Sequence, residues 1–410
     1  MAPSMRARVA LILLMSSAAA TASGESVTES EAIRMFLEQS PQARELPLIV
    51  QSVAAERRED TRPPNPELAY QIEDAAGVRD EFLTLRQELP VSGRRSLVRE
   101  SADAAGSAAG LAAERDLVVA ASVLRTSFYE ILYRENASGR LRRGTERLRR
   151  IVDILAVRER EGEGSGYDLL RAEQELAEIG IAASEAEAAL SVARARFGSF
   201  FDPEREMESA HLAGELRPAD GLPDPDEALQ RALEQRGDLQ ALRAEVLRLD
   251  LDRRAARRRR FPEPTLNAGW KRTEGVGLDD TGFVASLTVP LSVFDRGQVS
   301  AAKASAEQKR VELELETLER EIRADVQAAI AREQSARRAA KRYGEEVEQR
   351  AEELRRIAEL AYDEGETGIL ELLDAYRSSL ATELRALAVR YEAKRAEIDR
   401  DRAIGAEVKP

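Results

Sequence analysis

An internal duplication is the sequence feature that most limits how this chain can fold. Four short segments recur in the same order in both halves of its 410 residues. The first matched pair begins at residues 31 and 227, an offset of 196, and the last begins at residues 161 and 364, an offset of 203. Chance similarity between helices rich in Ala and Glu can explain one such match, but not four in register. The sequence therefore predicts two copies of one structural unit.

Each copy reads as the same succession of elements: a helix, a β-hairpin, a long helix, a tip and a returning helix. The hydrophobic period changes from that of a helix to that of a strand and back again. In the first copy, residues 23–216, we expect a helix over about 30–58, the hairpin at about 66–90, the long helix at about 95–160, the tip at 161–167 and the return helix at 168–200. In the second copy, residues 226–405, the hairpin and later elements are expected at about 263–292, 297–363, 364–370 and 371–402, and a Pro-rich linker at 217–225 joins the copies.

The hairpin segments alternate apolar and polar residues. Ala285, Leu287 and Val289, for example, alternate with Ser286 and Thr288. Strands of roughly ten residues with one apolar side are typical of a transmembrane barrel wall. The alternative is an ordinary half-buried hairpin on a soluble core. Four strands cannot close a pore by themselves, so the barrel interpretation requires several chains.

The two long helices contain no proline and would each be about 100 Å long at about 1.5 Å per residue. Helices of this length need lateral partners. The first return helix carries a heptad seam of apolar, mostly small residues, among them Leu169, Ala172, Leu176 and Ile179. Small residues let neighbouring helices approach closely, so the sequence predicts long coiled-coil hairpins.

Composition excludes several classes of function. The chain has no Cys and a single His, His211, which removes disulfides, thiolate metal sites and any His-based cage within one chain. The formal net charge of −13 argues against a nucleic-acid partner. Charged residues make up 33% of the chain and aromatic residues only 4%, which favours long solvated helices over a thick core. We predict no cofactor and no dedicated metal site.

The N-terminus has the three-part layout of a secretory signal. Arg6 and Arg8 precede an apolar run over residues 9–15, and Ala20-Thr21-Ala22 fits a cleavage site, so residues 1–22 are expected to be a signal peptide. The apolar run is too short for a spanning helix. No Cys follows it, so lipidation at a mature N-terminal Cys is not expected. No later stretch has about 20 consecutive apolar residues, and membrane insertion would have to use strands.

This order of elements, present twice, resembles the TolC family of outer-membrane factors over essentially the whole mature chain. The short length and missing lipidation Cys look most like the CzcC-type branch linked to heavy-metal efflux. The resemblance implies a mainly α fold with a small transmembrane β portion, in which three chains form an α-helical barrel joined to a 12-stranded β-barrel, four strands per chain. Such a protein is not an enzyme. It is an outer-membrane conduit with a periplasmic tunnel, fed by an inner-membrane pump of the resistance–nodulation–division type through a periplasmic adaptor.

The resemblance also implies an aperture near the closed end of the tunnel. Relatives carry an acidic pair at the start of the last long helix, and this chain has Glu371 and Asp374 there. Residues three apart share a helical face, so both carboxylates can point into the lumen. Asp168 occupies the matching position in the first copy, and Tyr362 matches a tyrosine involved in tip closure in some relatives. The alternative is that the acids only complement the dipole of a helix N-terminus.

The hairpin tips are the expected docking points for the adaptor. Gly162 and Gly365 match the glycine that a sharp reversal requires, and each is followed by an acid, Glu163 and Glu366. The residue before each glycine is also a Glu, where drug-type relatives have an apolar residue. Docking is therefore expected to rely more on charge here. Thr367 stands where an arginine is expected, which leaves the details of the closed-state latch open.

Three further interpretations remain open from the sequence. The arginine-rich run 253–260 directly precedes the second hairpin and suits either lipid head groups or a solvated helix end. The exit duct of a type I secretion system would have the same architecture as an efflux duct. A periplasmic coiled-coil scaffold without a pore is the alternative from another class.

Overall fold

The computed structural model describes residues 26–59 and 61–406, and the expected signal peptide lies outside the described residues. The helices and strands occur in the order β1 (Val27–Thr28), α2 (Glu29–Gln39), α3 (Pro41–Glu59), β2 (Glu67–Ala75), β3 (Val78–Glu88), α4 (Arg94–Arg160), α5 (Gly166–Gly198), β4 (Leu212–Ala213), α6 (Pro225–Gln235), α7 (Gly237–Arg258), β5 (Thr265–Gly275), β6 (Leu278–Thr288), α8 (Gln298–Arg342), α9 (Glu348–Asp363) and α10 (Ile369–Ile404). A short 3-10 turn, Pro203–Arg205, lies between α5 and β4, and a π-helical turn, Tyr343–Val347, joins α8 to α9. The expectation of a mainly α fold with a small β portion is confirmed.

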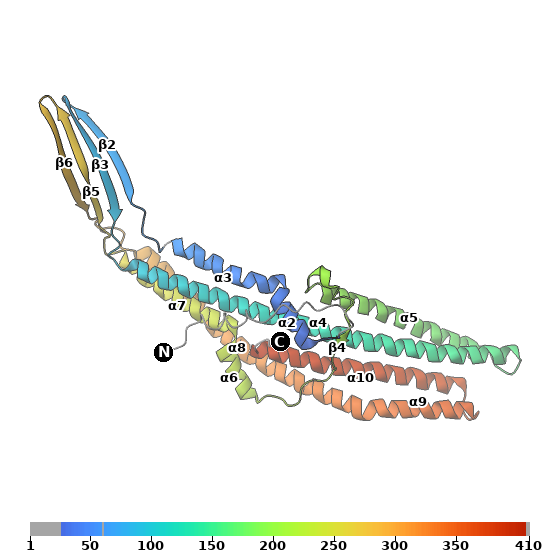
Figure 1. The fold of residues 1–410 in the computed structure, drawn as a ribbon. Helices are drawn as coiled ribbons and strands as arrows, with labels where there is room; N and C mark the ends of the chain where they lie inside the picture. Colours follow the sequence, from blue (N-terminus) through green and yellow to red (C-terminus); the bar gives the residue numbers. More distant parts are fainter. Residues whose placement is uncertain (1–25, 60, 407–410) are drawn as a thin grey trace.

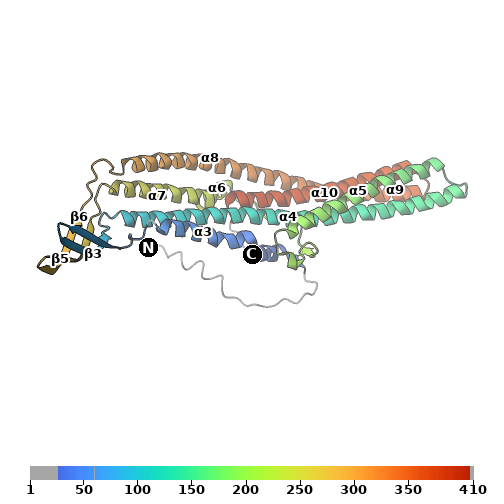
Figure 2. The ribbon, with the colours of Figure 1, turned by 90° about the horizontal axis from the view of Figure 1, so that it is seen from above.

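The molecule is an elongated helical bundle with a sheet at one end (Figure 1). α4 has 67 residues and is therefore about 100 Å long. Seen from above, α4, α7 and α8 lie along one another in the half nearer the sheet, while α5, α9 and α10 accompany α4 in the other half (Figure 2). The two hairpins, α4–α5 and α9–α10, end at the far tip from the sheet.

The four long strands form one antiparallel sheet in the order β2-β3-β5-β6. Their register places apolar residues in rows across the sheet: Tyr70 pairs with Leu83, Leu83 with Trp270, and Trp270 with Phe283. This face is open, since Trp270 is 68% and Phe283 is 70% exposed. Because directly paired residues point to the same side of a sheet, the register joins the apolar sides of both hairpins into one continuous surface.

The opposite face of the sheet is polar. Lys271 pairs with Asp80 at 2.8 Å, and the Thr273 hydroxyl donates to the same carboxylate at 2.6 Å. Gly269 lies where a Cβ would come within 2.0 Å of the Leu83 carbonyl oxygen, so this position of β5 accepts only glycine without a backbone shift. The alternation expected from the sequence is thus realised in both hairpins.

The expected first helix over residues 30–58 is wrong in one respect: it is two helices, α2 and α3, which meet at Ser40. Pro41 opens α3, and the residue before a proline is disfavoured in helical geometry. Ser40 has the extended angles φ −64° and ψ 145°. Its Oγ accepts a hydrogen bond from the Ala43 N–H at 3.1 Å, which caps the new helix.

The core lies between helices and is richest midway along the bundle. Phe36, Phe128, Phe197 and Ile398 are its largest buried members there, contributed by α2, α4, α5 and α10. None of the helices in the described part of the chain combines the length and apolar character needed to cross a bilayer.

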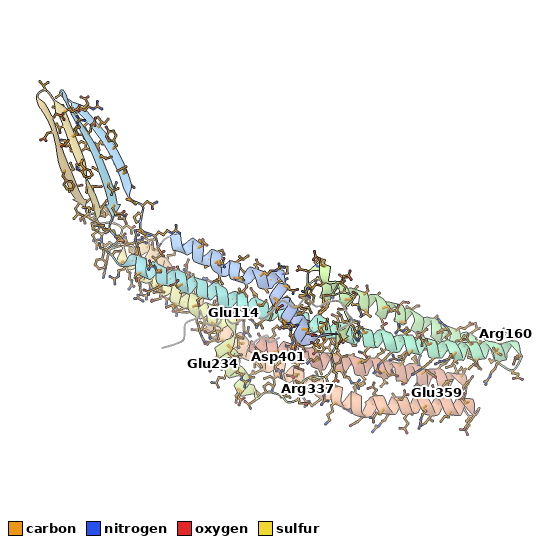
Figure 3. All side chains as sticks on the ribbon, viewed as in Figure 1. Glu114, Arg160, Glu234, Arg337, Glu359 and Asp401 are labelled. Atoms are coloured by element: carbon orange, nitrogen blue, oxygen red, sulfur yellow. The ribbon has the colours of Figure 1, made fainter. Side chains whose placement is uncertain are left out.

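A chain of ion pairs, most of them half-buried, crosses the same level of the bundle. Arg125 of α4 contacts Glu29 of α2 at 2.5 Å and Asp401 of α10 at 3.0 Å, and the Tyr129 hydroxyl donates to Glu29. The carboxylate of Glu333, which is fully buried, contacts two arginines, at 2.6 Å from Arg337 and at 3.3 Å from Arg400. Arg337 and Asp401 both lie in this middle region (Figure 3). The network joins α2, α4, α8 and α10, four helices that are distant in sequence.

We expect Arg125→Gln to lower the free energy of unfolding by about 2 kcal/mol per chain, because it leaves the half-buried carboxylates of Glu29 and Asp401 with one partner fewer. The measurement is thermal unfolding of the detergent-solubilised protein followed by circular dichroism. Arg44→Gln is the matched control: its pair with Asp202 is exposed and 3.6 Å long, so its loss should cost less than about 0.5 kcal/mol. Equal effects of the two substitutions would contradict a structural role for the buried network.

The same network makes the free energy of unfolding depend on pH in the acidic range. Burial alone would raise the pKa of Glu29, but Arg125 and the Tyr129 hydroxyl outweigh it and hold that pKa below the ordinary value of 4.5. The stabilisation is therefore present above pH 4.5 and is lost as the pH falls through the lowered pKa in the folded protein. We expect Glu29→Gln to flatten this acid limb in a pH series of unfolding temperatures and to leave the slope above pH 5 unchanged.

Candidate functional site

The two hairpin tips have the same backbone design. At the first tip the Glu163 N–H donates to the Arg158 carbonyl at 2.9 Å and the Gly162 N–H donates to the Glu159 carbonyl at 3.1 Å. The second tip repeats both bonds with Glu366 and Gly365 as donors. This paired pattern is a Schellman motif, whose turn residue takes a positive φ. Gly162 has φ 77° and Gly365 has φ 76°, so both glycines occupy the positions for which the sequence predicted them.

The tips carry exposed acids. Glu161, Glu163, Glu364 and Glu366 are all exposed, two beside each glycine. The last turn of α4 also contains Arg158 and Arg160, whereas the last turn of α9 contains no basic residue. The second tip is therefore the more acidic of the two.

Glu371 and Asp374 share the exposed face of the first turns of α10, as their spacing predicted. The next residues on the helix, Leu372 and Leu373, are buried instead, and they pack with Leu148 of α4 in the core below the tips. Glu371 is the third residue of α10, and its Oε2 lies 3.1 Å from the place of a Cβ on the N-terminal Gly368. This position also suits the interaction with the helix dipole, so the two interpretations of Glu371 are compatible.

Arg377, one turn further along α10, is a residue that sequence reasoning missed. Its Nη2 contacts Asp374 Oδ1 at 2.8 Å, and both side chains are exposed. The carboxylate of Asp374 is thus partly neutralised within its own helix. The i, i+3 spacing of these residues was the available signal. In the first copy Asp168 is the third residue of α5 and half-buried, with Arg171 in place of the second acid.

Tyr362 and the other aperture candidates do not form one cluster of hydrogen bonds. The Tyr362 side chain is half-buried against the core below the tips, and among the described residues no hydrogen bond joins its hydroxyl to Glu371 or Asp374. Tyr376 makes the contact that joins the two helices of this hairpin, because its hydroxyl donates to Glu359 of α9. Arg355 also contacts Glu359, at 2.5 Å, and lies over the Tyr376 ring at 5.7 Å. Glu359 lies near the end of the hairpin (Figure 3).

The electrostatics of this contact keep the hydroxyl protonated. Burial, followed by the hydrogen bond to Glu359, raises the pKa of Tyr376 to about 12. Bonds to Glu352 and the charge of Glu359 raise the pKa of the Arg355 guanidinium. Tyr376 therefore acts as a hydrogen-bond donor over the whole physiological pH range.

A second ion cluster joins the two hairpins further from the tips. Arg140 of α4 contacts Glu348 at 2.9 Å and Glu383 at 3.0 Å, and Arg390 also contacts Glu348, at 2.5 Å. Glu348 directly follows the π-helical turn, a feature that is frequent at functional sites. The two contacts of Arg140 span more than 200 residues of sequence, so no local pattern pointed to them.

No group of three or more His, Asp or Glu side chains is arranged to hold a metal ion within residues 26–59 and 61–406. The features of the candidate site are charged surfaces and ion pairs, located at the end of two long hairpins.

Known proteins resemble this chain both in sequence and in fold. Residues 228–406 match the family model described as outer membrane efflux protein. The cobalt-zinc-cadmium resistance protein CzcC of Cupriavidus metallidurans is 25% identical over 353 residues, which cover 83% of this chain and 81% of that protein. A membrane protein from Pseudomonas aeruginosa superposes with a TM-score of 0.76 at 18% identity. The superposition covers 96% of this chain and 100% of the chain of that protein. The outer membrane channel CmeC of Campylobacter jejuni has a TM-score of 0.76 at 13% identity and coverages of 95% and 90%.

A four-stranded sheet with an open apolar face, carried on long helical hairpins, is the fold that this chain shares with the solved channel CmeC. The fold is shared over nearly the whole length of these two solved proteins, and the match to the family model lies in the second half of the chain. Residues 228–406 of the chain thus resemble the outer membrane efflux protein family, and the relative CzcC aligns with most of the chain. The expected resemblance to TolC-type proteins is thereby confirmed.

We expect Tyr376→Phe to lower the free energy of unfolding by about 1 to 2 kcal/mol per chain, because it leaves the half-buried Glu359 without its hydroxyl donor. Tyr362→Phe is the matched control, since it removes the hydroxyl of a neighbouring half-buried tyrosine and should change stability by less than about 0.5 kcal/mol. Both are read from thermal unfolding in detergent. The reverse order of effects would show that the tip depends on Tyr362 instead.

Proposed function

We propose that three copies of this chain form the outer-membrane duct of a tripartite efflux system, and that heavy-metal cations are its cargo. The observation that carries the proposal is the sheet. β2 and β6 each have a neighbour on one side only, and an open edge is not tolerated in the hydrocarbon of a bilayer. Pairing β6 of one chain with β2 of the next satisfies both edges, and three chains give the 12 strands that the family resemblance implies.

The cargo is inferred from the name of the similar protein CzcC. That protein is a cobalt-zinc-cadmium resistance protein and aligns with most of this chain. An exposed acidic face on α10 fits a cationic cargo, because rings of carboxylates attract cations and repel anions. In a trimer, Glu371 and Asp374 would contribute six carboxylates around one constriction, with Asp168 and Tyr362 nearby.

The tips support docking of a periplasmic adaptor. Gly162 and Glu163 at one tip, and Gly365 and Glu366 at the other, are exposed and lie furthest from the sheet (Figure 1). Their charge favours an adaptor whose contacting surface is basic. An inner-membrane pump of the resistance–nodulation–division type would then supply the cargo through that adaptor.

The exit duct of a type I secretion system is the second candidate, because it would use the same architecture. The name of the heavy-metal relative favours efflux. A scaffold without a pore fits poorly, since it gives no role to a sheet with one open apolar face and two open edges.

Reconstitution into planar bilayers tests the duct and its aperture together. We expect a cation-selective conductance from the purified trimer, and a fall of about twofold or more in the cation-to-anion permeability ratio for Glu371→Gln/Asp374→Asn. Glu185→Gln/Glu187→Gln is the control, because it neutralises two exposed acids of α5 away from the tips. A soluble monomer without conductance would refute the duct. Unchanged selectivity in the aperture variant would refute the aperture alone.

Deletion of the gene tests the cargo. We expect the growth of the deletion strain to become sensitive to cobalt, zinc or cadmium salts, and a copy of the wild-type gene to restore it. Replacement of Glu163 and Glu366 by Lys should restore growth less well, because it reverses charge at both tips while leaving the glycines in place. Unchanged metal tolerance together with loss of a secreted protein from the medium would favour the type I secretion system.

A further inference from the structure

Three helix ends meet directly below the sheet. α4 and α8 begin there and α7 ends there (Figure 1). They enclose a pocket of about 320 Å³ whose lining includes Arg94 of α4, Arg259 at the end of α7, and Ser300 and Lys303 of α8. The pocket therefore lies at the level where the polypeptide passes from helices to the proposed membrane-inserted strands.

The pocket and its rim carry unpaired positive charge. Among the ion pairs in the described part of the chain, none involves Arg258, Arg259, Arg260 or Arg296. The guanidinium groups of Arg258 and Arg260 lie over the ring of Phe261, at 5.6 and 4.7 Å from its centre. This arrangement combines cations with a partly exposed aromatic ring, as is usual at the interface between a membrane and water.

Two acids also line the pocket, and both have cationic or polar partners. Asp252 accepts hydrogen bonds from Ser101 at 2.5 Å and from Arg248 at 2.6 Å. Glu307 lies 4.0 Å from Lys303. Neither Arg94 nor Arg259 forms an ion pair among the described residues. The charge of Arg94 also acts on the carboxylates of Glu88 and Glu263, so Arg259 is the less compensated of the two arginines that face an anionic ligand.

Backbone donors add to this positive potential. α4 and α8 start after Gly93 and Gly297, which have φ of 69° and 78°, and neither glycine supplies a side-chain cap. The first N–H groups of both helices point toward the sheet end and lack intrahelical partners. The Arg94 N–H donates to the Ser92 Oγ at 3.2 Å, and the remaining first N–H groups, together with the helix dipoles, favour a phosphate group.

An exposed apolar surface continues from the sheet to the pocket. Leu287 is on the apolar side of β6, and beyond the strand Leu291 is 80%, Phe294 is 90% and Val299 is 75% exposed. Val299 and Lys303 lie one turn apart on α8. A ligand at this position would thus meet apolar side chains toward the sheet and basic side chains toward the helices.

We propose that the pocket between α4, α7 and α8 binds the phosphate of an anionic phospholipid from the membrane leaflet on the helical side. Its acyl chains would lie along the apolar face of the sheet, with its head group between Arg94, Arg259 and Lys303. The inference rests on the proposed insertion of the sheet into a membrane. The bound lipid would fix the depth of the sheet and hold the helices at a defined angle below it.

Native mass spectrometry of the full-length trimer in detergent, titrated with dioleoyl-phosphatidylglycerol, tests the proposal. We expect Arg94→Gln/Arg259→Gln/Lys303→Gln to bind this lipid about tenfold or more weakly, since each basic residue near a membrane surface contributes to attraction. The control Arg149→Gln/Arg323→Gln/Arg356→Gln neutralises three exposed arginines on α4, α8 and α9 away from the pocket, and it should bind as the wild type does.

Ser300→Glu is the second variant. Ser300 is exposed at the third position of α8, where an acid favours the helix, so folding is retained while the new carboxylate repels phosphate. We expect the same loss of lipid from this variant, with the trimer intact in the same spectra. If the triple variant fails to assemble, lipid binding by Ser300→Glu alone tests the proposed site.

Several results would overturn the inference. Wild-type lipid affinity in Ser300→Glu would do so, as would an equal loss in the control. Displacement of the lipid by millimolar inorganic phosphate would indicate a site for free anions. Cross-linking of a photoreactive residue at position 300 to a second chain of the trimer would show that a neighbouring copy covers the pocket. A trimer that conducts in bilayers but binds no lipid here would refute this site alone, whereas absence of trimer and conductance would refute the proposed duct.

Discussion

The two open edges of the sheet are the constraint on which the rest of this molecule depends. The outer strands β2 and β6 each present an edge of backbone N–H and C=O groups with which no strand in the described part of the chain pairs. In water such edges invite aggregation, and in hydrocarbon each unpaired group costs several kcal/mol. Other copies of the chain satisfy them in the proposed trimer. Because the strands connect to α3, α4, α7 and α8 through short segments, closing the sheet into a barrel also arranges the helices around the same axis.

Ion pairs between the helices of one chain hold them in a fixed alignment when they are arranged around this axis. The core of the helical part is narrow and rich in Ala, so much of the specificity between helices comes from ion pairs such as Arg125 with Glu29 and Asp401. A buried charge that loses its partner is costly, and a shifted helix register would break these pairs at once. Midway along the bundle the network therefore fixes how α2, α4, α8 and α10 align. Toward the tips, Arg140 and the small apolar core around Leu148 are among the contacts that join the two hairpins.

Much of the fold could be predicted because its signals are local. Alternation in the hairpins fixes which side of each strand is apolar, and the glycines at 162 and 365 mark Schellman turns. Contacts between distant segments could not be predicted in the same way. The parallel pairing of Val27 with Leu212 involves strands of two residues, too short for any periodicity. Tyr376 and Arg140 looked like ordinary helix residues, since their partners become neighbours only when the helices pack. The break at Ser40, by contrast, was readable from Pro41.

The pair formed by Asp374 and Arg377 changes how the proposed aperture would handle cations. Glu371, Asp374 and Arg377 together carry one net negative charge per chain, so a ring of three chains is less acidic than the carboxylates alone suggest. An ion pair this exposed contributes less than about 1 kcal/mol, and a divalent cation can compete with Arg377 for the carboxylate. Asp374 would then be screened by Arg377 in the absence of cargo and free to contact a passing cation. The first copy cannot act in this way, because Arg171 occupies the matching position. In the proposed aperture, the inequality of the two copies would put the cation-sensitive residues on α10.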